Sequence, residues 1–467
     1  MTELADAPLD VRTGPAPRPD QATPAVSDGG GITPRFLADV HDAAAQCNRC
    51  SLCQAVCPTY VVNPVEWETA RGRVALIRDA IEGRIELRDI AEGPLSTCLT
   101  CNNCMAACAP GVDTARIVSR ARQELHAQEG HPRGQTLLLR GILPRPGAMR
   151  LLRGLARAGE ATGVLPLARR SGVTRLMGVP GAMLEMTGRL PARSAYRRAR
   201  DIAPPPAPRG RVGLVMCCVQ NIVAPDATEA TMRVLTAAGY EVVVPSLGCT
   251  GLPGKSQGDR DAELEMARRT VETLAPLDVD LLVGDVASCT EQVRDAGSLL
   301  AGEGRYAAAA ARVSARTVHA STLLAERGIQ APLGRLRWTV AIDEPCALPH
   351  EGPERSAAAR LLAQVPGLRV VPLTEAAMCC GGAGAYFHSE PERSAAILAR
   401  KMENVVRSGA QVLVTENVSC LNQLREGARR HAPSVRVLHV MEVLAESIDV
   451  ERRRGLTRGG SGASLPH

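Results

Sequence analysis

The stretch CNRCSLCQAVCP, residues 47–58, places four cysteines at the spacing C-x2-C-x2-C-x3-C. The same spacing returns 51 residues later in CLTCNNCMAACAP, residues 98–110. Three closely spaced thiolates can take three corners of a polynuclear metal centre, provided that the chain turns tightly between them. The duplicated run therefore predicts a small domain built around two such centres.

This spacing is that of the runs that bind [4Fe–4S] clusters in bacterial-type ferredoxins, where the fourth cysteine of each run ligates the other cluster. This exchange of the fourth cysteines, the crossed pattern, predicts two ligand sets. One cluster has Cys47, Cys50, Cys53 and Cys108, and the other has Cys98, Cys101, Cys104 and Cys57. One detail departs from the pattern, because Ala109 separates Cys108 from Pro110, whereas a proline follows Cys57 directly. Two zinc sites are the alternative, but paired zinc ligands would not explain four cysteines at fixed spacing in each run.

A second, longer repeat occupies the C-terminal half of the chain. Its cysteines recur at displacements of 128, 130 and 131 residues, from Cys218, Cys249 and Cys289 to Cys346, Cys379 and Cys420. Strand-like apolar segments precede them at 211–216, 241–245 and 279–285, and again at 337–342, 368–373 and 410–417. Alternation with helical patterns predicts parallel sheets, whose ligand sites lie beyond the carboxyl ends of the strands. Each copy is therefore expected to gather its cysteines at one end of its sheet.

The stretch MCCGGAGAYF, residues 378–387, distinguishes the two copies of the long repeat. In the C-terminal copy, the candidate site for a third cluster or metal comprises Cys346, Cys379, Cys380 and Cys420. The weaker candidate site of the N-terminal copy comprises Cys218, Cys249 and Cys289. That copy has Thr250 where a second adjacent cysteine would stand, and it has an extra cysteine at Cys217. Buried unreactive cysteines are the alternative for both copies.

These features predict a multidomain chain with two tails. Residues 1–35 are rich in Pro, Gly, Asp and Ala without apolar periodicity, and residues 449–467 likewise predict a disordered tail. The expected units between them are an α-helical ferredoxin-like di-cluster domain at 36–130, an Arg-rich helical segment with a Pro-rich linker at 131–210, and two tandem α/β cysteine-rich domains with parallel sheets at 211–333 and 334–448.

The segment 131–210 stands out by its charge. It carries 15 Arg and no Lys against three acidic residues, a net charge of +12 in a chain whose total is +6. Apolar clusters among these charges predict short amphipathic helices, broken at Pro144, Pro146 and Pro166. Such a segment can lie on an anionic lipid surface, dock an acidic partner subunit, or cover the clusters as a packed helical layer. Nucleic acid is not expected as a partner, because Tyr196 is the only aromatic residue of the segment and no binding motif is present.

The 16 cysteines of this chain are expected to be reduced thiols or metal ligands. The first 30 residues lack the basic and apolar regions of a secretory signal, and no run of about 18 apolar residues predicts a transmembrane helix. We therefore expect a cytoplasmic protein, with peripheral contact to the inner face of the cell membrane as a further candidate.

Residues around the cysteines resemble a known family. The stretches CPTY at 57–60, ARGRVALIRDAIEG at 70–83 and CCGGAGAY at 379–386, followed by KMENVVRSGAQVLVTENVSC at 401–420, are similar to the iron–sulfur subunits of glycolate oxidase. PCALPH at 345–350 resembles that family's C-x3-H segment, with Cys346 and His350. The order of a ferredoxin-like module and two tandem cysteine-rich CCG domains extends the resemblance over about residues 36–447.

The resemblance implies an electron-transfer subunit within an oxidoreductase complex. Oxidation of a 2-hydroxy acid, glycolate or else lactate, would take place on a partner flavoprotein that carries FAD. Electrons would then pass through two [4Fe–4S] clusters on this chain toward quinone or another acceptor. A third iron–sulfur cluster, or a thiol-lined metal site, is implied for the CCG domains. No catalytic residue is assigned here, and the chain has no G-x-G-x-x-G dinucleotide fingerprint.

Other functions remain open at this stage. The chain is more loosely similar to the iron–sulfur subunits of anaerobic glycerol-3-phosphate dehydrogenase and of heterodisulfide reductase. The latter would place thiol–disulfide chemistry at Cys379 and Cys380. Full versions of the CCG domain end in C-x-x-C, however, whereas this chain has the single cysteines Cys289 and Cys420. A regulatory zinc protein is the third class, and it would be colourless where cubane clusters are brown.

Overall fold

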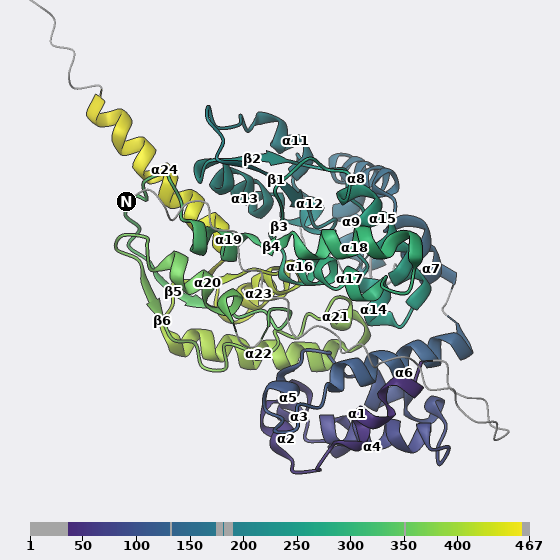
Figure 1. Cartoon of the computed structure of the whole chain (residues 1–467). Helices are drawn as coiled ribbons and strands as arrows, with labels where there is room; N and C mark the ends of the chain where they lie inside the picture. The colour runs from purple at the N-terminus through teal and green to yellow at the C-terminus, as the bar shows by residue number, and fades with distance from the viewer. Residues whose placement is uncertain (1–35, 131–132, 174–180, 182–189, 350–351, 460–467) are drawn as a thin grey trace, which may run out of the picture.

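The computed structural model of the chain describes residues 36–130, 133–173, 181, 190–349 and 352–459. It consists of an N-terminal helical module, a helical linker and two α/β domains (Figure 1). The tail predicted at 1–35 lies outside the described residues. Over the ranges described, no helix combines the length and the apolar content needed to cross a bilayer.

The N-terminal module packs short helices around two longer ones. Its elements are η1 (Ala38–Val40), α1 (His41–Ala45), α2 (Leu52–Val56), α3 (Pro58–Val62), η2 (Glu66–Glu68), α4 (Ala70–Ile81), η3 (Leu87–Ile90), η4 (Ala91–Leu95), α5 (Asn103–Ala106) and α6 (Thr114–Glu129). Side-chain caps start both long helices, with Thr69 accepting from the amide of Gly72 and Asp113 from that of Arg116. Helices α4 and α6 pack against each other around buried apolar side chains such as Ile77.

Each α/β domain contains one parallel sheet of four strands, as the alternating pattern predicted. The first sheet has the order β2-β1-β3-β4, with β1 (Gly210–Val215), β2 (Tyr240–Val243), β3 (Leu281–Gly284) and β4 (Thr317–His319). The second has the order β6-β5-β7-β8, with β5 (Thr339–Ile342), β6 (Arg369–Val371), β7 (Val412–Thr415) and β8 (Arg436–His439). The fourth strands, β4 and β8, were not predicted from the sequence.

Helices cover both sheets. Those of the first domain are α12 (Gln220–Val223), α13 (Pro225–Ala237), α14 (Leu252–Gln257), α15 (Arg260–Leu274), α16 (Ala287–Arg294), α17 (Ala296–Leu299), α18 (Gly304–Ala315) and α19 (Ala320–Arg327). Those of the second are α20 (Pro353–Leu362), α21 (Tyr386–Ser389), α22 (Pro391–Ser408), α23 (Val418–His431) and α24 (Val440–Gly459). In Figure 1, α22 lies along the side of the second domain that faces the N-terminal module.

The C-terminal helix corrects one prediction. Residues 449–459 were expected to belong to a disordered tail, but α24 continues through them to Gly459. Its buried Ile448 joins a hydrophobic core that both α/β domains share, and Asp449 forms an ion pair with Arg233 of α13. These tertiary contacts stabilise a helix end whose local composition favours disorder. Residues 460–467 lie outside the described part.

Buried polar groups also join the two α/β domains. His439, at the end of β8, donates to the carbonyl of Asp285 at 2.8 Å, and His319, at the end of β4, has Nδ1 3.6 Å from Glu416 Oε1. Burial lowers the pKa of His439 to about 4 and that of His319 to about 3. Burial also raises the pKa of the side-chain carboxyls of Asp285 and Glu416 to about 7. Neutral imidazoles therefore link each sheet end to the other domain, close to both cysteine sites.

The linker is helical, as expected. Its described elements before β1 are α7 (Arg133–Thr136), η5 (Leu137–Ile142), α8 (Pro146–Ala161), α9 (Val164–Ser171), α11 (Ala195–Arg198) and η7 (Ala199–Asp201). The chain breaks around Pro144, and Pro146 starts α8. Pro166, however, lies in the first turn of α9, where proline removes no helical hydrogen bond. The turn between the helices falls instead at Gly163, whose φ is 79°.

Candidate metal centres

The backbone is left-handed at the same positions of the two cysteine runs. Arg49 and Ser51, on either side of the second cysteine of the first run, have φ of 55° and 74°. Thr100 and Asn102, on either side of the second cysteine of the second run, have φ of 48° and 60°. Left-handed conformations cost a non-glycine residue about 1 kcal/mol or more, and they persist only where the surroundings impose them. The 51-residue repeat in the sequence is thus also a repeat of backbone conformation, and the chain turns sharply around the second cysteine of each run.

One cavity brings cysteines of both runs together. Its lining includes Cys57 of the first run and Cys98, Cys101 and Cys104 of the second. These are the four residues that the crossed ferredoxin pattern assigns to one cluster. Burial raises the pKa of Cys104 to about 12, and the neighbouring Cys98 adds to this effect. The thiols are therefore costly to ionise unless positive charge compensates for them.

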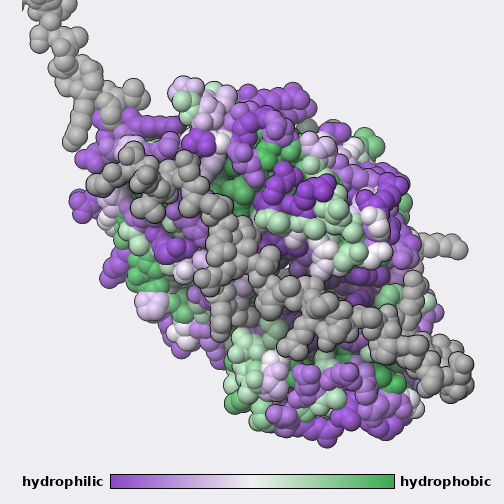
Figure 2. Space-filling view, viewed as in Figure 1, coloured by the Kyte–Doolittle hydropathy of each residue, from purple (hydrophilic) through white to green (hydrophobic). Residues whose placement is uncertain are grey.

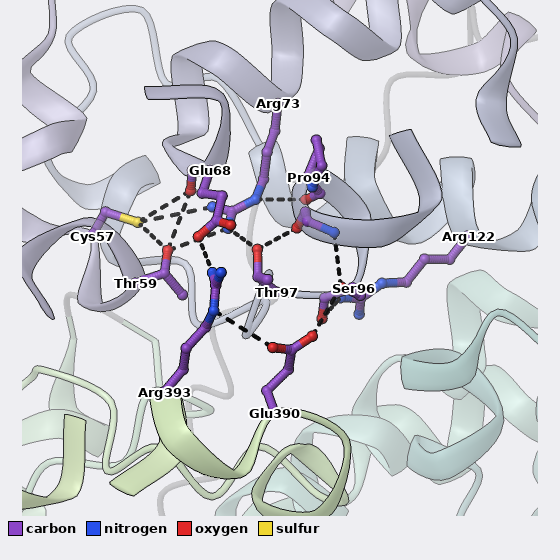
Figure 3. A network of polar contacts seen from close by, with 11 residues as sticks. Cys57, Thr59, Glu68, Arg73, Pro94, Ser96, Thr97, Arg122, Glu390 and Arg393 are labelled. Atoms are coloured by element: carbon purple, nitrogen blue, oxygen red, sulfur yellow. Dashed lines mark hydrogen bonds and ion pairs between the residues drawn. The ribbon is translucent and has the colours of Figure 1, made fainter. Parts of the chain in front are cut away.

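The buried Arg73 and the partly buried Arg122 supply that positive charge. Arg73 donates to the carbonyl of Pro94 at 2.7 Å and to the hydroxyl of Thr97 at 2.8 Å, and its guanidinium is 3.9 Å from the sulfur of Cys57 (Figure 3). Arg122 donates to the carbonyl of Cys98 at 2.6 Å. Burial acts to lower the pKa of Arg73, but ionised Cys98 and Cys57 outweigh it and raise this pKa.

The charge of the buried Glu68, which pairs with Arg393, also raises the pKa of Arg73. A buried cation whose charge is not fully balanced costs several kcal/mol. A cluster ligated by four thiolates, with its net negative charge, would complete this arrangement of Arg73 and Arg122. The donor set and its surroundings therefore fit a [4Fe–4S] cluster.

The other four cysteines of the runs lie nearer the surface. Burial raises the pKa of Cys53, and the nearby thiols of Cys57 and Cys47 raise it further. Cys47 and Cys108 pack against the same hydrophobic cluster of the module, while Cys50 is exposed. Helix α2, which contains Cys53, packs on α5 of the second run. The two runs thus lie against each other, as ligand exchange between them requires.

The four cysteines of the C-terminal copy converge beyond the carboxyl ends of β5, β6 and β7. Cys380 Sγ is 3.4 Å from Cys420 Sγ, and Cys379 packs with Cys346 in one hydrophobic cluster. Three of them are at most 4% exposed, and Cys346 is partly buried. The structure therefore gathers Cys346, Cys379, Cys380 and Cys420 at one end of the sheet.

Lys401 supports this thiol site, although the sequence did not single it out as functional. It is fully buried on α22, pairs with Asp343 at 2.7 Å and donates to the carbonyls of Ala376 and Met378 at 2.7 and 2.9 Å. Hydrogen bonds from Cys379 and Cys420 lower the pKa of Cys380, and the charge of Lys401 adds to that. One signal was present in the sequence, since Lys401 is one of only two lysines in an Arg-rich chain.

The glycine after the adjacent cysteines is required by geometry. Gly381 has a φ of 82°, and a Cβ there would lie 2.8 Å from the carbonyl oxygen of Ser394. Glu375 and Ala383, in the same loop, have φ of 56° and 29°. Together with the four residues of the cysteine runs, they are all the left-handed non-glycine residues of the described chain. Backbone strain is thus confined to the cysteine sites.

The N-terminal copy also gathers its cysteines, and it includes one more than predicted. Cys218 packs with Cys249 in one hydrophobic cluster, and the adjacent Cys217 packs with Cys289 in another. All four are at most 9% exposed. The sequence marked Cys217 as an extra cysteine but could not place its side chain among the others.

The C-terminal thiol site lies against the second cysteine run. Cys101 packs in one hydrophobic cluster with Cys379 and Cys346, and Cys346 contributes to raising the pKa of Cys101, after burial itself. Asn103 Nδ2 donates across this contact to the carbonyl of Ala377 at 3.1 Å. Two further interactions join the N-terminal module to the second α/β domain, an ion pair of Arg393 with Glu68 and a hydrogen bond from Ser96 to Glu390 (Figure 3). The two candidate centres therefore share one interior, which the sequence did not predict.

Two further results concern single-metal sites. His350, which the resemblance marked beside Cys346, lies outside the described residues. Within the ranges that the structure covers, no group of three or more His, Cys, Asp or Glu side chains is arranged to hold a metal ion.

Comparison with protein families matches every part of this arrangement. A 4Fe–4S dicluster domain matches residues 43–112, and a cysteine-rich domain matches twice, at 212–294 and 340–425. The segment between them, residues 132–187, matches the linker region of the glycolate oxidase iron–sulfur subunit.

Curated relatives agree over most of the chain. The probable glycolate oxidase iron–sulfur subunit of Bacillus subtilis (strain 168) is 27% identical over 415 residues, which cover 86% of this chain and 93% of the relative. The glycolate oxidase iron–sulfur subunit of Escherichia coli (strain K12) is 26% identical, over 87% of this chain and 94% of its own. Lactate utilization protein A of an Exiguobacterium species is 26% identical, over 51% of this chain and 98% of its own. The chain is therefore a homologue of the glycolate oxidase iron–sulfur subunits, with their dicluster domain, linker region and paired cysteine-rich domains.

Proposed function

We propose that this chain is the electron-transfer subunit of a flavin-dependent 2-hydroxy-acid oxidase or dehydrogenase complex. Glycolate is the leading substrate and lactate the second, since relatives of both names match. A partner flavoprotein carries the FAD and the substrate chemistry, and quinone or another acceptor receives the electrons. The observation that carries the proposal is the cavity in which Cys57 joins three cysteines of the second run, beside the buried Arg73 and with Arg122 bonded to the carbonyl of Cys98.

The eight cysteines of the two runs are the proposed cluster ligands, with Cys47, Cys50, Cys53 and Cys108 at one centre and Cys98, Cys101, Cys104 and Cys57 at the other. Bound [4Fe–4S] clusters supply single-electron transfer. The chain's own contribution is to hold the thiols in strained turns and to place the guanidiniums of Arg73 and Arg122 beside one set. Positive charge there favours the reduced, more negative state of a cluster.

The proposed route continues into the C-terminal thiol site. Cys101 and Cys346 lie in one hydrophobic cluster. An electron that leaves the second run would therefore reach that site through packed side chains and not through water. We propose Cys346, Cys379, Cys380 and Cys420 as ligands of a third cluster, and we keep 36–130, 131–210, 211–333 and 334–448 as the functional units of the chain.

Iron and acid-labile sulfide per chain test this function directly, on anaerobically purified full-length protein with EPR of the reduced form. Two cubanes give about eight iron per chain, and a third cluster gives about twelve. Reduction by the partner flavoprotein with 2-hydroxy acid should then produce the EPR signals. A colourless protein without iron after anaerobic reconstitution would contradict the relay.

We also propose peripheral membrane contact through the helix pair α8 and α9. Seven of the eleven large hydrophobic side chains that are exposed in the described chain lie between residues 137 and 173. Leu151, Leu155 and Leu167 are 65%, 62% and 67% exposed, on a molecule whose visible face is largely hydrophilic (Figure 2). On α8 the usual orientation is inverted, because Arg153 and Arg157 turn inward and donate to backbone carbonyls at 2.7 and 2.8 Å.

An outward apolar face within a segment of net charge +12 suits an anionic bilayer, whose surface offers both apolar and negatively charged partners. The double variant Leu151→Glu/Leu155→Glu should lower binding to phosphatidylglycerol-containing vesicles at least about 100-fold, since each leucine contributes about 1.5–3 kcal/mol on burial. Vesicle flotation at low and high salt measures this. Val370→Glu/Val406→Glu, which changes exposed valines of the second α/β domain, is the matched control and should float like the wild type. Wild-type protein that stays unbound would refute membrane contact.

A further inference from the structure

The N-terminal cysteine-rich domain lacks one cysteine of the adjacent pair, yet its structure gathers four thiols. Thr250 stands where the C-terminal copy has Cys380, so the sequence predicts an incomplete site. Cys217 has no counterpart in the other copy, where proline occupies the equivalent position 345. The missing thiol and the additional one thus occur in the same domain.

Packing among the thiols shows what Cys217 does. In the C-terminal copy, Cys346 and Cys379 share one hydrophobic cluster, Cys380 and Cys420 share another, and Cys380 Sγ is 3.4 Å from Cys420 Sγ. In the N-terminal copy, Cys218 and Cys249 share one cluster, and Cys217 and Cys289 share another. Both copies therefore pair their four thiols in the same way. The thiol that reaches the cysteine after the third strand is Cys380 in one copy and Cys217 in the other.

The surroundings of these two thiols also correspond. A buried aspartate lies near each, Asp285 near Cys217 and Asp343 near Cys380. Cys217 also packs with Cys289 and with Val418 of the second domain, in the cluster that joins the two domains. The side chain therefore points into the site.

We infer that Cys217 replaces the thiol missing at Thr250, so that Cys217, Cys218, Cys249 and Cys289 form a complete four-thiolate site able to ligate an iron–sulfur cluster. This inference rests on the proposed electron-transfer function and adds a centre in the domain that the sequence marked as degenerate. A soft, all-sulfur donor set of this kind is the one that iron–sulfur clusters require.

The linker completes this site. Leu139 and Leu143 of the linker pack against Cys218 and Cys249, and the amide of Cys249 donates to the carbonyl of Leu143 at 2.9 Å. A cavity of about 150 Å³ between the linker and this domain borders Cys249 and is lined also by Gly248, Arg269, Pro144 and Pro146. Helix α8, with its outward leucines, starts at the last of these prolines. The linker thus connects the thiol site to the helix pair that we propose for membrane contact.

The test compares Cys217→Ser with the double variant Cys217→Ser/Thr250→Cys, in full-length protein reconstituted anaerobically. Cys217→Ser should lower the iron content by up to about four per chain and leave the EPR signals of the two dicluster-domain centres unchanged. The double variant moves a thiol to the position used in the other copy, beside Cys289, and should restore the iron. Thr250→Ser, which leaves the four thiols intact, is the matched control and should hold as much iron as the wild type.

Thiol alkylation followed by mass spectrometry gives a readout that does not depend on the variants folding. In folded, reconstituted wild-type protein, Cys217 should resist alkylation together with the other three cysteines, and a chelator should expose all four at the same rate. Independent alkylation of Cys217, a disulfide within the set, or unchanged iron in folded Cys217→Ser would each overturn the inference. Failure of the electron-transfer function looks different, since the dicluster-domain signals themselves would then be missing.

Discussion

Replacing Cys57 by Ser is expected to remove the cluster of the second cysteine run and to spare that of its own run. Iron should fall from about eight to about four per chain in a protein with two cubanes, and the EPR signal that is lost should be the one lost in Cys98→Ser. The reason is spatial, because Cys57 shares a cavity with the cysteines of the second run. Electron flow from the partner flavoprotein should fall of the order of 100-fold or more, since centres in series cannot bypass one another.

The matched variants lie in the same repeat. Cys108→Ser should reproduce the spectrum of Cys47→Ser, although Cys108 belongs to the second run by sequence. These four variants, compared by EPR and iron content under identical reconstitution, decide between crossed and uncrossed ligation. A Cys57→Ser protein whose spectrum equals that of Cys47→Ser would show that each run binds its own cluster.

Replacing Arg73 by Met is expected to have the second large effect. Arg73 is 2% exposed and donates to Pro94, Thr97 and Thr59 in addition to its contact with Cys57. Its loss leaves these buried acceptors unpaired and removes a cation next to a thiolate set, at a cost of about 3–5 kcal/mol in the free energy of unfolding. The reduction potential of the neighbouring cluster should also become more negative, because its reduced state carries one more negative charge.

Chemical denaturation and a redox titration followed by EPR measure the two effects of Arg73→Met separately. Arg73→Lys keeps the charge but not the planar donor fork, so it should recover part of the potential and less of the stability. Arg78→Met removes an exposed arginine of the same helix, paired only with Glu82, and should change neither by a measurable amount. An unchanged potential in Arg73→Met would place the cluster elsewhere than beside this guanidinium.

The contact between Cys101 and Cys346 gives the chain its functional geometry. It joins residues that are 245 positions apart, and it brings the second cysteine run next to the C-terminal thiol site. The ion pair of Arg393 with Glu68 and the hydrogen bond of Asn103 to Ala377 hold the two domains in this register. The proposed relay of centres thus depends on a domain interface, and loosening that interface would separate the proposed centres without removing any of their ligands.

Much of this architecture could be predicted from local patterns. The spacing of cysteines within each run is short-range information, because a thiolate two or three residues away can only reach the same centre through a tight turn. Buried parallel strands such as β1 and β7 are recognisable because both faces are covered, which requires nearly continuous apolar residues. The strands β4 and β8 and the end of α24 were not predicted from the sequence, because tertiary packing and not their own sequence stabilises them.

By itself, the sequence determined the fold class, the eight cysteines of the dicluster domain and the duplicated α/β domains, because spacing and periodicity record which side chains share a turn, a face or a strand end. Only the tertiary structure decided that Cys217 joins its domain's thiols, that Lys401 and Arg73 bring buried charge to the cysteine sites, and that Cys101 meets Cys346. These contacts arise between segments far apart in the chain, where packing sets the distances and no spacing along the sequence can encode them.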